Sequence, residues 1–210
     1  MKDTRVVMLS GSFEYDSHES LVILRDFLRA NAAVDCELIQ FESEGDESSL
    51  APIEEADVLL LFTRRLLTAG SELERLQQYC RDGRPIVGLR TASHGWQNWL
   101  DFDREILGGN YQGHYGGVTT TVELSQSDEP HAILQGVQAF EAHGSLYRNT
   151  PLAKDTDLLL TGNQDGHREP VAWTCERSQR AFYTSLGHQG DFWELDFLRL
   201  VRNGILWAIN

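Results

Sequence analysis

The chain has 210 residues, a hydrophobic fraction of 41% and a formal net charge of −14 at pH 7. This composition is typical of a folded α/β domain with a sizeable core, and nothing in it indicates disorder. The acidic excess argues against a nucleic-acid partner or an anionic membrane surface, because both are bound through basic patches. It does not bear on a small-molecule ligand, which responds to the local field only.

The cysteines and the distribution of apolar residues indicate a reducing, aqueous compartment. Cys36, Cys80 and Cys175 lie far apart and lack the spacing of a metal motif, so we expect three reduced thiols. No apolar run approaches the roughly 18 residues of a membrane span, and no signal-like segment precedes the first strand pattern. We therefore expect a cytoplasmic protein with no membrane partner.

The first half of the chain alternates strand and helix patterns. Apolar runs predict strands at 6–10, 37–41, 57–62 and 85–89. Leucine stripes at helical spacing predict one helix beginning near residue 16 and another over about 71–82. This alternation predicts parallel strands with right-handed crossovers and helices on both faces of the sheet.

The second half begins with a segment rich in glycine and aromatic residues, 91–117, that contains one short helix at 102–107. Further strands are predicted at 118–124, 157–161, 170–174 and 180–185. A final amphipathic helix covers about 193–209. Neither a repeat nor a linker divides the chain, so a single domain over residues 1–210 is predicted.

Polar residues follow several of the predicted strands. Ligands of open parallel sheets bind outside the carboxyl ends of the strands, so these residues are candidates for a site. They are Ser12, Arg64, Arg65, Arg90, Ser93, His94 and His188. The three arginines offer bidentate hydrogen bonds to a carboxylate, a phosphate or sugar hydroxyls. The alternative is that they pair with nearby carboxylates.

The turn Ser93-His94-Gly95 is the sharpest local signal. A tight turn of small residues after a strand presents a serine as a nucleophile beside backbone N–H groups. We expect the neighbouring His94 to point elsewhere, so the base would come from His114 or His188. In the alternative interpretation Ser93 caps the turn and His94 makes a structural hydrogen bond.

The loop 110–114 combines hydrogen-bonding side chains with an aromatic ring. Asn110, Tyr111 and His114 suit a sugar, whose hydroxyls need donors and acceptors while its ring stacks on aromatic faces. Trp96 and Trp99 are further candidate faces, or else ordinary core residues.

Acidic and imidazole side chains from several loops raise the question of a metal. The candidate ligands are Glu14, Asp16, His18, His94, His114 and His188. None of them has short-range ligand spacing, so we predict no metal site and no required cofactor, with a divalent ion as the lesser alternative. His131, His143 and His167 receive no role.

Six segments, in order along nearly the whole chain, resemble the trehalose-utilisation (ThuA-like) family. They are GRPIVGLRTASH (83–94), LGGNYQGH (107–114), GSLY (144–147), PVAWT (170–174), FYTSLGH (182–188) and NGILWA (203–208). The resemblance implies a three-layer α/β/α sandwich with a flavodoxin-like, class I glutamine-amidotransferase-like fold and a mostly parallel central sheet. It also implies a role in carbohydrate catabolism, on a trehalose-type disaccharide or its keto derivative.

Two departures argue against glutamine hydrolysis. Amidotransferases of this superfamily have an Ala-x-Cys-His-Gly elbow, whereas Ser93 stands at the cysteine position here. Their later His-Pro-Glu pattern is replaced by Gly-His-Gln-Gly at 187–190.

The preferred function is therefore an enzyme that processes a sugar, with hydrolase, lyase and isomerase activities all compatible. The arginines would position the substrate, and His94, His114 and His188 would supply acid and base groups near neutral pH. The alternatives are a non-catalytic sugar-binding or regulatory protein and a metal-dependent hydrolase. Self-association as a homo-oligomer is compatible with this fold class.

Overall fold

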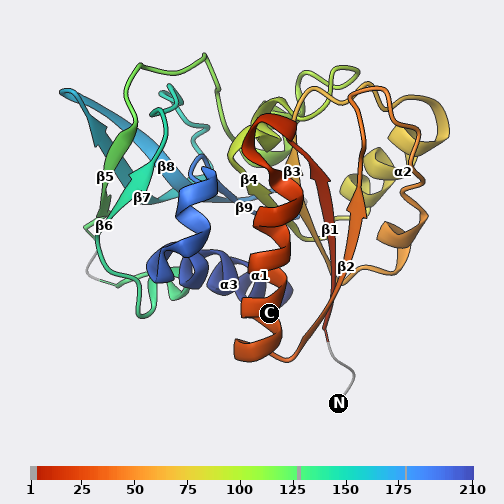
Figure 1. The fold of residues 1–210 in the computed structure, drawn as a ribbon, viewed down its shortest axis with the longest axis horizontal. Coiled ribbons are helices and arrows are strands. Elements are labelled where there is room, and N and C mark those ends of the chain that lie inside the picture. The colour runs from red at the N-terminus through yellow and green to blue at the C-terminus, as the bar shows by residue number, and fades with distance from the viewer. Residues whose placement is uncertain (1–3, 127–128, 178) are drawn as a thin grey trace.

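A computed structural model describes residues 4–126, 129–177 and 179–210. Over these ranges nine strands form one continuous sheet in the order β2-β1-β3-β4-β9-β8-β7-β5-β6 (Figure 1). The strands are β1 Thr4–Gly11, β2 Val34–Gln40, β3 Val58–Thr63, β4 Ile86–Leu89, β5 Thr119–Leu124, β6 Phe140–His143, β7 Thr156–Gln164, β8 His167–Glu176 and β9 Arg180–Thr184.

Three α-helices and several short turns complete the fold. The α-helices are α1 Ser17–Asn31, α2 Gly70–Arg81 and α3 Leu195–Ile209. The 3₁₀ turns are η1 Phe13–Tyr15, η2 Ala51–Glu55, η3 Arg90–His94, η5 Ala132–Leu134 and η6 Gln189–Trp193, and a π-helical turn, η4, covers Asp103–Leu107.

The sheet is mixed, so the prediction of a mostly parallel sheet was wrong. From β2 through β1, β3 and β4 to β9, each pair of adjacent strands is parallel. Strands β9, β8, β7, β5 and β6 pair antiparallel. Short connections join β7 to β8 and β8 to β9, and such connections force the chain to reverse, whereas a parallel pair needs a long crossover. Strand β6 was not predicted, because it has only four residues and its alternation of Phe140 and Ala142 with Glu141 and His143 is too short to indicate a strand.

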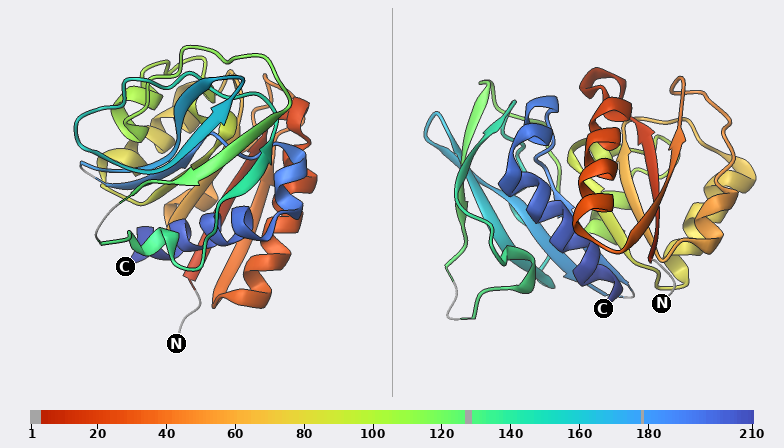
Figure 2. Two further views of the ribbon diagram at one scale, coloured as in Figure 1. Left: turned by 90° about the vertical axis from the view of Figure 1, so that its left-hand side faces the viewer. Right: turned by 60° about the horizontal axis from the view of Figure 1, so that its bottom comes forward.

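Helices cover both faces of the parallel half. In Figures 1 and 2, α1 and α3 lie on one face, and α2 lies on the other. Strand β3 is buried along its whole length because alternate side chains enter different cores. Leu60 and Phe62 pack with the leucines of α1, while Leu59 and Leu61 pack with Leu76 of α2. The continuous apolar run at 57–62 therefore reflects a strand covered on two sides.

This arrangement brings the carboxyl ends of the five parallel strands to one edge of the sheet. The turns η1, η3 and η6 follow β1, β4 and β9 there, so the candidate site residues are gathered by the sheet itself. The three cysteines are buried and free. None of the helices in the described ranges is long and apolar enough to cross a bilayer.

The contact between α3 and β9 yields a test of the packing. A Cβ atom added at Gly204 of α3 would lie 2.2 Å from Cδ1 of Phe182, a ring that is completely buried. Because this contact is far inside van der Waals distance, the cost lies toward the upper end of the usual range for overpacking, at about 2–3 kcal/mol, against a gain in helix propensity of about 1 kcal/mol. We expect Gly204→Ala to lower the free energy of unfolding by about 1–2 kcal/mol in chemical denaturation. Arg199→Ala on the same helix is the control, with a change within about 0.5 kcal/mol. A Gly204→Ala protein as stable as wild type would contradict this packing.

Candidate active site

Arg90, the first residue after β4, lies at the centre of the group of loops that follow the carboxyl ends of the parallel strands. Its side chain is 1% exposed, and its guanidinium carbon lies 4.5 Å from the ring centre of Tyr15 and 4.9 Å from that of Tyr147. Nη1 donates to the carbonyl of Ser185 at 3.1 Å, and Nη2 donates to the Tyr15 hydroxyl at 3.3 Å. Arg90 was predicted to contact the substrate, but in this structure it is enclosed between two tyrosine rings.

The positive charge of Arg90 acts on the histidines around it. Burial, together with Arg64, Arg65 and Arg90, lowers the pKa of His94 to about 3. Burial and Arg90 also lower the pKa of His188. A low dielectric and a nearby like charge both disfavour the protonated imidazole, so His94 is neutral at physiological pH.

His94 is held by a ring and a hydroxyl. Its ring stacks on Tyr111 with centres 4.4 Å apart and planes at 15°, and Nδ1 lies 3.1 Å from Oγ of Ser93. The expectation that His94 points away from Ser93 was therefore wrong: the η3 turn brings the two side chains together. When the hydroxyl donates to Nδ1, the proton of the neutral ring is on Nε2.

A cavity of about 140 Å³ adjoins this pair. It is lined by Ser93, His94, Trp96, Trp99, Leu100, Asp103, Arg104, Gly109, Asn110 and Tyr111. Four of the predicted site residues thus meet at one cavity, and both candidate indoles lie in its wall. Its volume corresponds to about five waters, or to one small ring of similar bulk.

Asp103 is a residue of this cavity that the sequence did not single out. Its Oδ2 accepts the Tyr111 N–H at 2.8 Å, while Oδ1 is buried without a hydrogen-bond partner, as is Nε1 of Trp96. Burial raises the pKa of Asp103 to about 6. A Cβ atom on Gly109 would lie 2.1 Å from Oδ1, so a glycine is required for this close approach. The Gly108-Gly109 pair was the available signal, but it does not reveal which side chain approaches it.

The loop that carries Asn110 and His114 forms the rim of the site. Nδ2 of Asn110 donates to the carbonyl of Thr150 at 3.3 Å. His114 is exposed, and its Nδ1 lies 3.0 Å from the carbonyl oxygen of Tyr115. Because a carbonyl only accepts, Nδ1 carries the proton and Nε2 is left as an acceptor.

The remaining strand-end candidates do not line the cavity. Arg64 forms an ion pair with Glu14, with Nε 3.0 Å from Oε1, as the alternative interpretation expected. Arg65 is exposed, with φ of 51°. Ser12 is completely buried: its N–H donates to Oγ of Ser17, and its hydroxyl accepts from Thr91, both at 2.9 Å. Ser12 therefore joins the end of β1 to η3, and its side chain is not available to a substrate.

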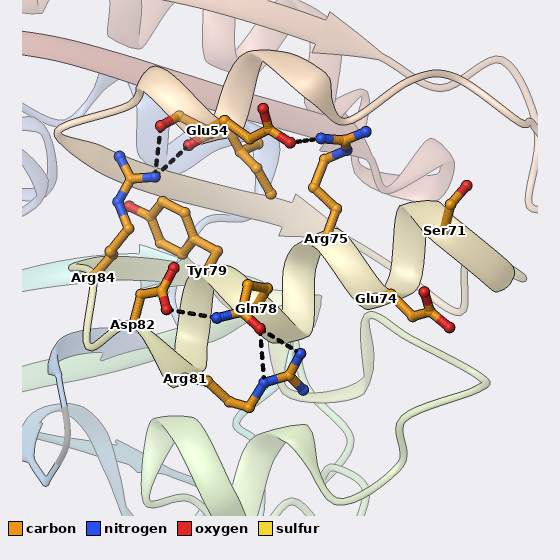
Figure 3. Close-up of a pocket in the computed structure, with 10 residues that line it drawn as sticks. Glu54, Ser71, Glu74, Arg75, Gln78, Tyr79, Arg81, Asp82 and Arg84 are labelled. Carbon is orange, nitrogen blue, oxygen red and sulfur yellow. Dashed lines mark hydrogen bonds and ion pairs between the residues drawn. The ribbon is translucent and has the colours of Figure 1, made fainter.

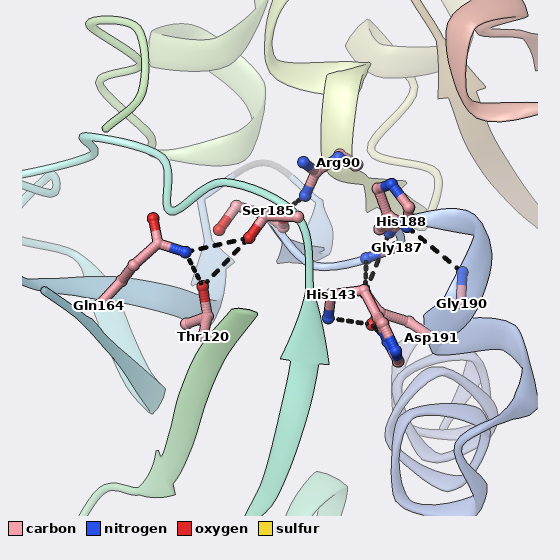
Figure 4. A network of polar contacts seen from close by, with 10 residues as sticks. Arg90, Thr120, His143, Gln164, Ser185, Gly187, His188, Gly190 and Asp191 are labelled. Carbon is pink, nitrogen blue, oxygen red and sulfur yellow. Dashed lines mark hydrogen bonds and ion pairs between the residues drawn. The ribbon is translucent and has the colours of Figure 1, made fainter. Parts of the chain in front are cut away.

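His188 does not line the cavity either, and belongs to a second polar group beside Arg90 (Figure 4). Its Nδ1 accepts from the N–H of Gly190 at 3.4 Å, and its own N–H donates to Oδ2 of Asp191 at 3.0 Å. The ring lies 5.9 Å from that of Tyr15, edge to face. His188 thus caps the η6 turn and also faces the aromatic side of the site.

The proposed metal ligands are separated by these contacts. Glu14 pairs with Arg64, and Asp16 accepts from the amide of Gln189 at 2.7 Å. Across the ranges that the structure describes, no group of three or more His, Cys, Asp or Glu side chains has the arrangement to hold a metal ion.

A larger groove, of about 560 Å³, lies along the outer face of α2 (Figure 3). Its charged groups bind one another: Arg75 contacts Glu54, and Arg84 donates to backbone carbonyls of η2. None of the predicted site residues lines it. The smaller cavity beside η3 is therefore the better candidate, because chemistry-bearing residues meet there.

The lowered pKa of His94 predicts a pH-dependent stability. Below about pH 6.5 the unfolded chain binds a proton at this residue, whereas the folded chain does not until about pH 3. Stability is therefore lost as pH falls, by about 1.4 kcal/mol per unit. Between pH 6.5 and 4.5 we expect wild type to lose about 2 kcal/mol more than His94→Gln, measured by denaturation at each pH. Parallel curves for the two proteins would contradict a neutral, buried His94.

Known protein structures with the same fold were found by comparison. A putative ThuA-like protein from Parabacteroides merdae superposes with a TM-score of 0.79 at 18% identity, covering 100% of this chain and 91% of that one. One from Bacteroides uniformis gives 0.73 at 16% identity, with 99% and 91% covered. A glutamine amidotransferase from Methylobacillus flagellatus gives 0.50 at 12% identity, with 90% and 69% covered.

No curated protein gives a significant match to the chain. The sequence profile described as trehalose utilisation, by contrast, matches residues 5–208, which is nearly the whole length. The fold is thus shared with glutamine-amidotransferase-like proteins, and the chain belongs to the ThuA, or trehalose-utilisation, family.

Proposed function

We propose that this protein is an enzyme that converts a trehalose-type disaccharide or its keto derivative, with one sugar ring bound in the cavity beside η3. The observation that carries the proposal is the composition of this cavity. Two indoles and a tyrosine ring line it together with the hydrogen-bonded pair Ser93 and His94. A family linked to trehalose utilisation agrees with a carbohydrate ligand.

The polar atoms in the cavity wall suit a sugar. Asn110 and Asp103 contribute an amide and a carboxylate to the lining, beside the hydroxyl of Ser93 and the imidazole of His94. Sugar hydroxyls both donate and accept, so a ligand of this class pairs with such groups while its ring lies against Trp99 or Tyr111.

The state of His94 favours a keto sugar. With a pKa of about 3 it is a weak base, which argues against a role in activating Ser93 as a nucleophile. With the Ser93 hydroxyl donating to Nδ1, the neutral imidazole has its proton on Nε2 and donates a hydrogen bond to a carbonyl oxygen instead. Arg90, Arg64 and Arg65 add a positive field, which stabilises negative charge that develops on that oxygen.

The test is turnover of trehalose and 3-keto-trehalose by the purified protein, followed by product chromatography. We expect conversion by wild type and a loss of about 10²-fold or more in kcat/KM for His94→Gln, because removing one donor to a developing oxyanion costs that much. His167→Gln is the control, since this exposed histidine is the first residue of β8, stacks on Tyr115 and does not line the cavity.

The other outcomes separate the alternatives. Saturable sugar binding without product, with and without added Zn²⁺ or Mn²⁺, would indicate a non-catalytic binding protein. Turnover that appears only with a metal would indicate the metal-dependent hydrolase. Full activity in His94→Gln would contradict the assignment of the site, and absence of both binding and turnover would contradict the function.

A further inference from the structure

The cavity beside η3 has an enclosed end and an open mouth. Ser93, Trp96 and Asp103 form the enclosed end, and each of them is at most 7% exposed. Leu100 and Arg104 line the same cavity, yet Leu100 is 74% exposed and the side chain of Arg104 is 76% exposed. A ligand in this cavity is therefore surrounded by protein at one end and open to solvent at the other.

The size of the cavity admits only part of a disaccharide. Its volume of about 140 Å³ suits one sugar ring. A trehalose-type disaccharide has two rings of similar bulk, so the second ring has to lie outside, against the residues of the mouth. His94 lines the cavity and offers its Nε2 proton to a carbonyl oxygen, so the ring that carries a keto group belongs inside.

Trp99, which is half-buried in the cavity wall, is held in a fixed orientation. Its Nε1 donates to Oε2 of Glu105 at 2.9 Å, and its ring meets that of the buried Phe102 edge to face, with centres 5.1 Å apart. The next residue, Leu100, adds an exposed apolar side chain. An indole held in this way, with an aliphatic side chain beside it, offers a rigid apolar surface to the C–H face of a sugar ring.

Arg104 supplies hydrogen-bond donors at the mouth. It pairs with Asp101, but Nη1 lies 3.7 Å from Oδ1 and both side chains are largely exposed. An exposed pair at this distance contributes little, so the guanidinium is able to turn toward a ligand. The backbone below it is fixed instead, because the carbonyls of Arg104 and Glu105 accept from Nη1 of Arg177 at 2.6 and 2.9 Å.

The other polar groups of the mouth suit a neutral ligand. The carboxylates of Asp101 and Glu105 offset the charge of Arg104, which argues against a phosphate or a carboxylate on the ligand. Asn110 uses Nδ2 to donate to the carbonyl of Thr150 at 3.3 Å, so Oδ1 is the atom that it offers to a ligand. A donor at Arg104 and an acceptor at Asn110 are the combination that sugar hydroxyls require.

We propose that the mouth of this cavity is a subsite for the second ring of a trehalose-type disaccharide, formed by Trp99, Leu100, Arg104 and Asn110. The C–H face of that ring packs on Trp99 and Leu100, while its hydroxyls bind Arg104 and Asn110. This ring contributes binding energy and takes no part in the reaction, so the subsite selects disaccharides over single sugars. The inference rests on the proposed function and adds the residues that determine its substrate.

The test compares a two-ring substrate with a one-ring substrate in the turnover assay. 3-Keto-trehalose and methyl 3-keto-α-glucoside share the keto ring, and a methyl group replaces the second ring in the latter. We expect wild type to have the lower KM for the disaccharide. Arg104→Ala removes charge-assisted hydrogen bonds, so KM for the disaccharide should rise about tenfold relative to KM for the glucoside, with kcat little changed. Leu100→Ala should raise the same ratio about threefold.

Gln77→Ala is the matched control. Gln77 lines a separate hollow of about 320 Å³ between α2 and η4, which Trp99 also borders. We expect this variant to leave both KM values unchanged. A rise in KM for the disaccharide in Gln77→Ala but not in Arg104→Ala would place the second ring in that hollow and overturn the inference.

Binding without turnover separates this inference from the proposed function. Calorimetric titration of His94→Gln, in which conversion is slow, gives Kd for both sugars, and adding Arg104→Ala should raise the Kd of the disaccharide about tenfold more than that of the glucoside. Equal affinity for the two sugars, or an equal effect of Arg104→Ala on both, would overturn the subsite and leave the proposed function intact. A wild type that converts neither sugar would overturn the proposed function, whereas a preference for the disaccharide that depends on Arg104 would still support the subsite.

Discussion

The buried guanidinium of Arg90 is the interaction on which the rest of the site depends. A charge that leaves water must be compensated, and here the compensation comes from two tyrosine faces and two oxygen acceptors. Tyr15 comes from the end of β1, Ser185 from the end of β9, and Tyr147 from the connection between β6 and β7. Tyr183 of β9 also donates its hydroxyl to the Arg90 carbonyl at 2.5 Å. One side chain thus joins the parallel and antiparallel halves of the sheet.

The charge of Arg90 makes the local electrostatic potential at the strand ends positive, although the chain as a whole is acidic. The net charge is −14, yet His94 sits among three arginines and has a strongly lowered pKa. Fields inside a protein are local, because distant surface charges are screened by water and salt while buried ones are not. The site therefore favours neutral imidazoles next to Arg90 and developing negative charge on a bound ligand. His143, by contrast, is more exposed and has the buried carboxylate of Asp191 beside it.

The sequence predicted the parts of this design that are set by local patterns. Apolar runs located β1, β3 and β4 closely, and the rule for strand ends led to Ser93 and His94. The sequence did not predict that Arg90 is buried, because the rings that cover its side chain are distant from it in the sequence. The sequence also did not predict the antiparallel half of the sheet, because the pattern of one strand does not indicate the direction of the strand that pairs with it. Asp103 and Asp191 are ordinary acidic residues until the fold places a backbone N–H beside each.

Two glycines are required here by close contact with a side chain and not by the conformation of the backbone. Gly109 and Gly190 have no positive φ, yet a Cβ on either would overlap a polar side chain, Asp103 in one case and the His143 ring in the other. In each case a carboxylate bonds to a backbone N–H, at Tyr111 or at His143, and so fixes a loop that carries an aromatic or imidazole ring. The cavity beside η3 and the η6 turn thus follow the same construction: a buried carboxylate, a glycine in close contact with a side chain that a Cβ atom would displace, and a ring held in place. Because close packing against the backbone leaves little freedom to a side chain, this construction supplies the preorganisation that transition-state stabilisation requires.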